Sequence, residues 1–378
     1  MRSLLFIFAV CLIAPCTISA QSPAPRLGAV SGYLSCADTH TPCRYAEVKI
    51  KSIQSFAHPK QFDKDKHSFS DEDMAELQSG SFSATTGLDG GFQINSVDPG
   101  DYYLTVYLAG YLDPSGLAYS EAQGGGSLSP QELAKHLNRI TVSPGLTTTS
   151  NLTISRGASL GGTVRFDDGG VASTVAIYLY RKDGTGKWCP YGGMFMGQFS
   201  PSSTTTNDRG RWYFSGLPSG SYIIEASLPQ PKFYNGIGLG LSSKGSDSLH
   251  VFNGDKYRLK EAPAIELSDG EDRSDIDIDI PTTGLNTLQG FITAKPDGRS
   301  VTKGAVSLLD PDDKSILRET SIQQDGSFSF NYLASGTYIV QIAAQADGGG
   351  VQYETLSVPL LVEGDMTGLS YAVSKAKR

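Results

Sequence analysis

Long apolar runs and basic tracts are both missing from this sequence of 378 residues. After residue 20 no segment approaches 18 uninterrupted apolar residues, which excludes an ordinary membrane-spanning helix there. Lysine and arginine number 31 against 39 aspartate and glutamate residues, a formal net charge of −8. A mildly acidic chain without a basic tract gives no support to binding of nucleic acid or of anionic lipid. We therefore expect a soluble chain with no transmembrane segment and no nucleic-acid partner.

The sequence patterns of common catalytic and metal sites are also missing. None of the five histidines belongs to a His-Glu-x-x-His pattern for zinc, and no Gly-x-Ser-x-Gly turn presents a nucleophile. No glycine-rich loop with a following lysine is present to hold a phosphate. These absences predict a protein that is not an enzyme and that has no metal site and no cofactor.

The first twenty residues are typical of a secretory signal peptide. They contain Arg2, an apolar run at residues 4–14 and small residues before Gln21. A lipoprotein leader is disfavoured because neither cysteine in this segment follows a small residue. We expect cleavage after Ala20 and hence a secreted or periplasmic protein, with a net charge of −9 once Arg2 is removed.

Cysteine is scarce beyond the leader, where it occurs only at Cys36, Cys43 and Cys189. In an oxidising compartment Cys36 and Cys43 can close a small loop, because the six residues between them can turn back through Pro42. Cys189 is then left over, either as a buried thiol or as the partner of one of the other two. No Cys-x-x-Cys or histidine-rich spacing accompanies the three, so a metal site is disfavoured.

What the sequence does contain is a motif repeated three times at fixed spacing. The motif is Gly-x-aromatic, seven residues, then Gly-x-Tyr, and its members are Gly90, Phe92, Gly100 and Tyr102; Gly210, Trp212, Gly220 and Tyr222; and Gly326, Phe328, Gly336 and Tyr338. Apolar residues alternate with others on both sides of the second glycine, which predicts two strands joined by a tight turn. Each motif is therefore predicted to be an antiparallel strand pair whose aromatic residues belong to the core and not to a ligand site.

Further marks bracket each motif and divide the chain into three domains. An opening apolar-x-Gly strand precedes each motif, and a strand, glycine turn and second strand follow it. We place the domains at residues 27–155, 156–282 and 283–376. The first carries an insertion at residues 52–82, and the middle one has insertions at 186–203 and 231–263.

Two short helices are expected among these strands. One spans residues 71–78 with Ser70 as its N-cap. The other lies in the segment 129–138, capped by Ser129, with Leu133 and Leu137 docked against the sandwich. The fold class predicted is all-β, with tandem sandwiches and short helical insertions.

Taken together, the opening Gly-x-Val strand, the Asp-Gly-x-Phe and Pro-Gly-x-Tyr elements and the closing Val-x-x-Gly strand resemble the carboxypeptidase regulatory-like domain. The resemblance implies a transthyretin-like (prealbumin-like, carbohydrate-binding-like) β-sandwich in three tandem copies over nearly all of the mature chain. It implies little about activity, because these modules serve as accessory, adhesive, stalk and carbohydrate-binding-like parts of unrelated exported proteins. The module has no peptidase site.

The candidates for binding are residues that differ between the repeats. The insertion at 186–203 carries Trp188, Tyr191 and Phe195, whose rings can offer flat faces to a sugar or to a partner protein. The competing interpretation, which we favour, is that a glycine-rich loop folds its aromatic residues over one end of the sandwich and extends the core.

Two acidic stretches are interpreted as structural. Residues 275–280 alternate aspartate with isoleucine, which predicts a strand with its isoleucines inward and its carboxylates in solvent. Carboxylates about 7 Å apart on such a strand suit a solvated face better than a calcium site. The stretch "DPDDK", which begins at Asp310, is interpreted as a polar turn. An isopeptide crosslink is disfavoured because no lysine recurs in register across the repeats.

The leading functional hypothesis is a secreted, non-catalytic β-sandwich array that binds a glycan or a cell-envelope protein, in adhesion or carbohydrate binding. One alternative is a structural spacer or scaffold of the cell envelope. Another is an accessory subunit of an exported hydrolase system.

Overall fold

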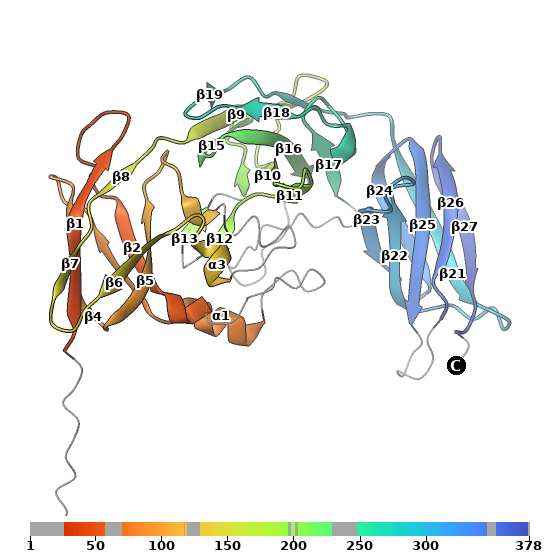
Figure 1. Ribbon diagram of the computed structural model, residues 1–378. Helices are drawn as coiled ribbons and strands as arrows, with labels where there is room; N and C mark the ends of the chain where they lie inside the picture. Colours follow the sequence, from red (N-terminus) through yellow and green to blue (C-terminus); the bar gives the residue numbers. More distant parts are fainter. Residues whose placement is uncertain are drawn as a thin grey trace, which may run out of the picture.

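The computed structural model describes residues 26–56, 70–116, 118, 129–195, 198–200, 203–228, 248–345 and 353–376. Most of the regular structure in these residues is β-strand, arranged as successive pairs of sheets (Figure 1). The predicted all-β class of tandem sandwiches is thereby confirmed. Three clusters of core residues fall within residues 30–142, 158–280 and 288–373; the domain limits themselves stay a prediction.

The first sandwich consists of two sheets around the first of these cores. Its strands are β1 (Gly28–Cys36), β2 (Glu47–Ser52), β3 (Ser81–Thr85), β4 (Gly91–Val97), β5 (Gly100–Tyr107), β6 (Asn138–Val142), β7 (Thr147–Thr149) and β8 (Leu152–Ile154). One sheet has the order β4-β1-β7, with β8 also beside β1, and the other has the order β3-β2-β5-β6. Strands β7 and β8 run parallel to β1, so the closing segment returns to the sheet that the first strand opened.

The second sandwich repeats this plan with additional short strands. These are β9 (Ala158–Phe166), β10 (Ala176–Lys182), β11 (Trp188–Pro190), β12 (Gly193–Phe195), β13 (Gln198–Ser200), β14 (Ser203–Thr205), β15 (Arg211–Leu217), β16 (Gly220–Leu228), β17 (Leu249–Phe252), β18 (Ile265–Leu267), β19 (Asp272–Arg273) and β20 (Ile278–Ile280). One sheet has the order β15-β9-β19, with β20 beside β9, and the other has the order β11-β10-β16-β17. The predicted burial of Ile276, Ile278 and Ile280 is confirmed, while Asp277 and Asp279 lie outside and pair with Arg165.

The third sandwich has the fewest strands. They are β21 (Leu285–Ala294), β22 (Lys303–Leu309), β23 (Ile316–Ser321), β24 (Ser327–Ala334), β25 (Gly336–Gln345), β26 (Leu356–Val362) and β27 (Met366–Val373). The sheet β24-β21-β27 faces the sheet β23-β22-β25-β26.

The two strands of each repeated motif lie in opposite sheets, which corrects the predicted antiparallel pair. β4 pairs with β1 whereas β5 pairs with β2, and the same division separates β15 from β16 and β24 from β25. Alternation along a strand shows which face is buried but not which strand lies beside it. The turn of the motif therefore carries the chain across the core, and the aromatic residues of its two strands enter the same core from both sheets.

A tyrosine hydroxyl secures each of these crossing turns. The three hydroxyls donate hydrogen bonds to the carbonyl oxygen four residues earlier: Tyr102 to Asp98 at 2.7 Å, Tyr222 to Pro218 at 2.6 Å and Tyr338 to Ala334 at 2.7 Å. All three rings are buried, as the repeat predicts. A core tyrosine that bonds back to the backbone at a sheet-to-sheet connection resembles the tyrosine corner of immunoglobulin-like sandwiches.

Both expected helices are present. Helix α1 (Asp71–Gln78) is confirmed with its predicted bounds, and the hydroxyl of Ser70 accepts a hydrogen bond from the backbone N–H of Asp73. Helix α3 (Pro130–Leu133) is shorter than expected, although Leu133 and Leu137 are both buried as predicted. Two 3₁₀ turns, Ile53–Phe56 and Leu259–Glu261, and helical residues at 114–116 and 118 are also present. Within the described residues no helix combines the length and the apolar content needed to cross a membrane.

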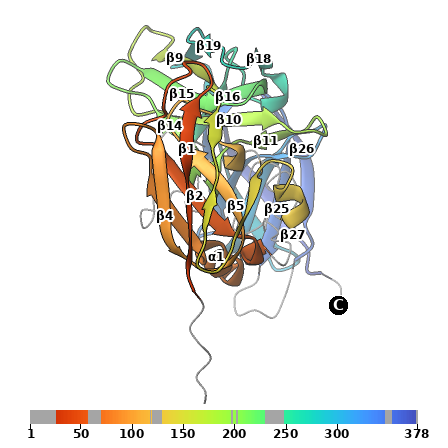
Figure 2. The ribbon, with the colours of Figure 1, turned by 60° about the vertical axis from the view of Figure 1, so that its left-hand side comes forward.

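The three sandwiches form an arch. Figure 1 shows the first and third sandwiches on either side of the second, both extending from it in the same direction. The turned view in Figure 2 places the first sandwich in front of the third, with the second at the upper end of both. The chain therefore has two junctions, one at each side of the second sandwich.

Candidate functional site at the junction of the second and third sandwiches

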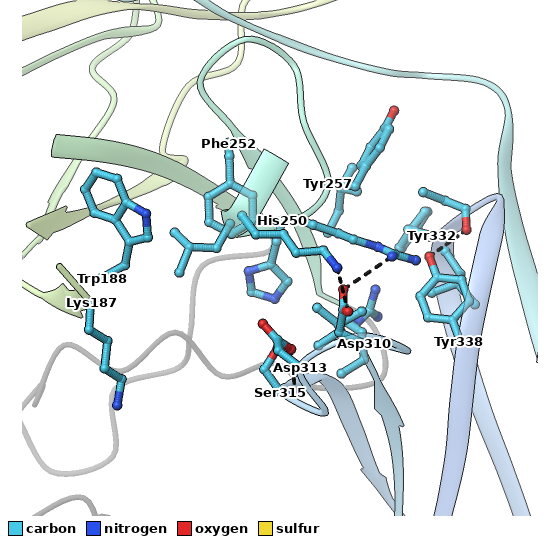
Figure 3. A pocket seen from close by; sticks show the side chains of 18 residues that line it. Lys187, Trp188, His250, Phe252, Tyr257, Asp310, Asp313, Ser315, Tyr332 and Tyr338 are labelled. Atoms are coloured by element: carbon cyan, nitrogen blue, oxygen red, sulfur yellow. Dashed lines mark hydrogen bonds and ion pairs between the residues drawn. The ribbon is translucent and has the colours of Figure 1, made fainter. Parts of the chain in front are cut away.

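A cavity of about 310 Å³ lies at the junction of the second and third sandwiches (Figure 3). We call it the junction cleft. The second sandwich lines it with residues of 187–188, 249–252 and 257–260, and the third with residues of 310–318 and 332–338. Its volume is at the lower end of the range for small-molecule sites, and boundaries between domains are common places for such sites.

Of the residues predicted to bind, Trp188 lines the junction cleft. It opens β11, which pairs with β10 so that Trp188 lies opposite Lys182. The indole is half-buried, and the Lys182 ammonium lies 5.4 Å from its ring centroid. Trp188 and Pro190 are partly exposed while Cys189 is buried, as the alternation of a strand requires.

Tyr191 is a core residue, which argues against its predicted role as a ligand contact. Only 2% of its surface is exposed, and its ring packs edge-on against that of Tyr222 at a centroid distance of 6.0 Å. Its backbone N–H donates to the carbonyl of Leu179 at 2.8 Å, which continues the β10–β11 ladder and turns the side chain inward. Burial also raises the pKa of Tyr191 strongly. Phe195 ends β12, and its side chain lies outside the described part of the structure.

A buried carboxylate lies behind the cleft on the second sandwich. Glu225 is fully buried, and it accepts a hydrogen bond from the Tyr180 hydroxyl at 2.6 Å. Nδ1 of His250, a cleft-lining residue, lies 2.5 Å from the other oxygen of Glu225. Burial, together with the neighbouring Glu225 carboxylate, raises the pKa of Tyr180 well above its ordinary value. The carboxylate thus holds the imidazole in one orientation at the edge of the cleft.

Ion pairs cross the junction at Asp310. The Lys260 ammonium lies 2.6 Å from one oxygen of this carboxylate, and the Arg258 guanidinium lies 3.3 Å from the other. Only 1% of the Asp310 side chain is exposed. Burial acts to raise the pKa of Asp310, but hydrogen bonds from Lys260 and from the backbone N–H of Asp312, with the charges of Lys260 and Arg258, outweigh it and hold the pKa below its ordinary value. Lys260 also pairs with Asp312.

Arg258 makes two more contacts with the third sandwich. Its guanidinium donates to the carbonyl of Thr337 at 2.7 Å and lies 5.2 Å from the ring centroid of Tyr338. Tyr338 is the tyrosine that secures the crossing turn of the third sandwich. One arginine of the second sandwich therefore contacts the crossing turn of the third through a hydrogen bond and a cation–π contact, in addition to its ion pair with Asp310.

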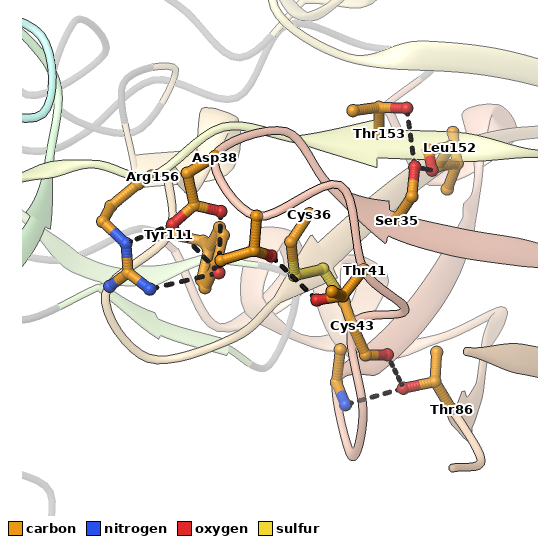
Figure 4. Close-up of a disulfide and its surroundings, with 12 residues drawn as sticks. Ser35, Cys36, Asp38, Thr41, Cys43, Thr86, Tyr111, Leu152, Thr153 and Arg156 are labelled. Atoms are coloured by element: carbon orange, nitrogen blue, oxygen red, sulfur yellow. Dashed lines mark hydrogen bonds and ion pairs between the residues drawn. A yellow bond between two sulfur atoms is a disulfide. The ribbon is translucent and has the colours of Figure 1, made fainter. Parts of the chain in front are cut away.

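The junction of the first and second sandwiches is built from the same kinds of group (Figure 4). Cys36 and Cys43 form a disulfide, and the loop between them carries Asp38. Arg156 donates to Asp38 at 2.6 Å, and its guanidinium lies 4.6 Å from the ring centroid of Tyr111. The hydrogen bond from Arg156 lowers the pKa of Asp38.

Sequence reasoning missed most residues of the junction cleft. Asp310 was expected in a polar turn, and its burial against Lys260 depends on the placement of two domains that the sequence pattern does not contain. Tyr332 lines the cleft with 52% of its surface exposed. Alignment of the three repeats sets it apart, because the same position of the motif is Ser96 in the first repeat and Gly216 in the second. Among the described residues no group of three or more histidine, cysteine or acidic side chains is placed to share a metal ion.

Comparison with known proteins assigns this chain to no family. No protein-family model matches the sequence, and no curated protein is significantly similar to it. Among solved structures, a streptococcal ancillary pilin is 11% identical, with 93% of this chain and 100% of that chain covered and a TM-score of 0.29. The minor pilin of Streptococcus agalactiae is 14% identical, with 59% and 98% covered and a TM-score of 0.27.

The Bacillus anthracis TIE protein is 12% identical to this chain, with 93% of this chain covered and a TM-score of 0.22. This chain spans about half of the length of that protein, 51%. Scores this low carry no argument about activity, ligand or assembly. The assignment to tandem β-sandwiches rests on the sheets described above.

Proposed function

We propose that this chain is an exported, non-catalytic array of three β-sandwiches that binds a saccharide in the junction cleft. The observation that carries the proposal is the cleft itself, a cavity of about 310 Å³ that exposes Trp188 of one sandwich and Tyr332 of the next. Aromatic faces bury a large area at a small entropic cost, which suits the flat apolar faces of sugar rings.

Several features support the broader part of this proposal. The leader-like first twenty residues support export to the periplasm or the cell exterior. The tyrosine-secured crossing turn that each sandwich contains supports three copies of a carboxypeptidase regulatory-like module, with limits at 27–155, 156–282 and 283–376. The engagement of Asp310 with Lys260 and Arg258 supports a structural rather than a catalytic role for this carboxylate.

A titration of intrinsic fluorescence tests the saccharide site. The chain has two tryptophans, and Trp212 is buried in the core with 4% exposed, so a change in emission on binding reports Trp188. We expect at least one of three neutral hexasaccharides, cellohexaose, xylohexaose or chitohexaose, to change the emission and to give a binding isotherm by calorimetry.

Variants then place the site. Trp188→Ala is expected to weaken binding in calorimetry by about tenfold or more, the loss of one well-packed ring contact. Tyr213→Ala is the matched control, because Tyr213 is an aromatic residue with 54% exposed that does not line the cleft. Equal binding by wild type and Trp188→Ala, or no binding of any of the three hexasaccharides, would contradict the proposal.

A second function, a stiff spacer of the cell envelope, is favoured by the two junctions. Each is held by an arginine that pairs with a carboxylate and covers a tyrosine ring. A spacer needs such fixed joints, and saccharide binding does not require both. Absence of hexasaccharide binding together with a fixed interdomain geometry in solution would favour this second function.

A further inference from the structure

One position of the repeated motif departs from ordinary backbone geometry in all three sandwiches. It lies six residues after the first glycine of the motif, at Ser96, Gly216 and Tyr332, with φ of 56°, 75° and 56°. At each of these positions the register of the strand pair shifts, so the residue belongs to a β-bulge. The bulge is a feature of the fold, and the three sandwiches fill it with different residues.

Glycine is the residue that such a backbone favours, because positive φ costs an L-residue of ordinary size about 1 to 2 kcal/mol. In the second sandwich glycine has a further reason, since a Cβ at Gly216 would lie 2.7 Å from the carbonyl oxygen of Tyr111. A bulky aromatic residue at positive φ is an outlier. The third sandwich nevertheless has a tyrosine here.

Packing does not account for Tyr332. Its side chain is 52% exposed, and within the described part of the chain it makes no hydrogen bond and no ring–ring contact. The neighbouring Leu333 is the residue that enters the core. Strained residues without a packing role gather at binding and catalytic sites, where the strain sets the direction of a side chain.

Tyr332 lines the junction cleft opposite Trp188 (Figure 3). Trp188 comes from β11 of the second sandwich and Tyr332 from β24 of the third, so the two rings are carried by different domains. The cleft therefore has an aromatic residue on each of its two walls.

We infer that Tyr332 is a ligand-contacting residue, kept at the strained bulge so that its ring faces a saccharide that also contacts Trp188. The inference rests on the proposed function and adds a second contact to it, on the other domain. A sugar chain bound between the two rings would bridge the second and third sandwiches. Binding would then depend on both domains.

The test uses the full mature chain and separates stability from affinity. Tyr332→Gly restores the residue that the bulge favours, so its melting temperature is expected to equal or exceed that of wild type. Its affinity for cellohexaose, xylohexaose or chitohexaose, whichever binds to wild type, is expected to fall about tenfold. Ser96→Gly is the matched control, since it makes the same backbone change at the same register position far from the cleft. It is expected to keep full affinity, and Tyr332→Phe, which retains the ring, is expected to keep most of it.

The outcomes distinguish this inference from the proposed function. If wild type binds a hexasaccharide and Tyr332→Gly binds it equally well, the role of Tyr332 is refuted while the cleft as a site stands. If Tyr332→Gly melts well below wild type, Tyr332 is a packing residue and the inference fails whatever the affinity. If wild type binds none of the three probes, the proposed function and the inference fall together.

Discussion

At the scale of single residues, the tyrosines of the motif matter more through their hydroxyls than the sequence alone indicates. The alternation places Tyr102, Tyr222 and Tyr338 in the core, but it does not show that each hydroxyl bonds to the backbone of the preceding turn. That bond ties the two ends of a connection between sheets, which the strand ladders cannot do.

Replacement of one such tyrosine by phenylalanine tests this role. Tyr222→Phe removes the donor to the buried carbonyl of Pro218, so we expect a loss of about 1 kcal/mol in the free energy of unfolding. Tyr338→Phe is expected to do the same through Ala334. Urea unfolding followed by far-ultraviolet circular dichroism measures the change. Tyr213→Phe, at an exposed ring, serves as the control; a Tyr222→Phe variant as stable as this control would show that the bond contributes nothing.

Residue type alone did not separate Trp188 from Tyr191. Both belong to one glycine-rich insertion, and which of them faces the core depends on the register of β11 against β10. A shift of one residue along a strand exchanges its two faces, and no side-chain pattern in so short a strand fixes that register. Tyr332 differs in that alignment of the repeats sets it apart from Ser96 and Gly216, but the positive φ that makes it unusual is a property of the backbone that the sequence does not show.

At the scale of elements, the sequence predicted most strands and the first helix but not the pairing of the repeated strands. Fixed spacing and alternation locate β4 and β5, β15 and β16, and β24 and β25. A short turn normally indicates a hairpin, and here it joins two sheets instead. The difference arises because both strands are buried on the side that faces the core, a condition that a hairpin and a sheet-to-sheet connection satisfy equally.

The disulfide loop is an element whose removal has a defined cost. Cys36 and Cys43 are separated by seven positions, and closing so short a loop stabilises by about 2 kcal/mol through the unfolded chain. We therefore expect the Cys36→Ala, Cys43→Ala double variant to lose about that amount from the first sandwich in urea unfolding.

Reduction provides the control for this prediction. Wild type in dithiothreitol is expected to match the double variant, and the variant itself is expected not to respond to dithiothreitol. A thiol titration checks that reduction is complete. Fully reduced wild type with an unchanged unfolding midpoint would contradict the prediction. Because Asp38 lies inside the loop and pairs with Arg156, loss of the disulfide is also expected to loosen the first junction.

At the scale of the whole molecule, the two junctions share one chemical plan. Arg156 pairs with Asp38 and covers Tyr111, and Arg258 pairs with Asp310 and covers Tyr338. The sequence contains no local pattern for either cluster, since their members are separated by tens of residues. A cleft of about 310 Å³ lies at the second junction, and Arg258, Lys260 and Asp310, which pair across that junction, line it.

Acid is expected to release the second junction. The pKa of Asp310 lies below its ordinary value of 3.8 in the folded chain. A carboxyl group with a lowered pKa contributes stability that is complete above its unfolded pKa and is lost as the pH falls through the folded pKa. The contact of Asp310 with Lys260 and Arg258 should therefore be intact at neutral pH and weaken progressively below about pH 3.8.

Small-angle scattering measures this release as an increase in the radius of gyration. Asp310→Asn is expected to be expanded already at pH 7, because Lys260 and Arg258 both lose the buried carboxylate that they share, and to change less than wild type on acidification. Asp313→Asn is the matched control, since Asp313 lines the same cleft but accepts from the backbone N–H of Ser315 within its own turn. A scattering curve for Asp310→Asn that coincides with wild type at pH 7 would mean that packing alone holds the second and third sandwiches together. Ligand affinity would then be independent of the bridge, since the walls that carry Trp188 and Tyr332 would keep their separation without it.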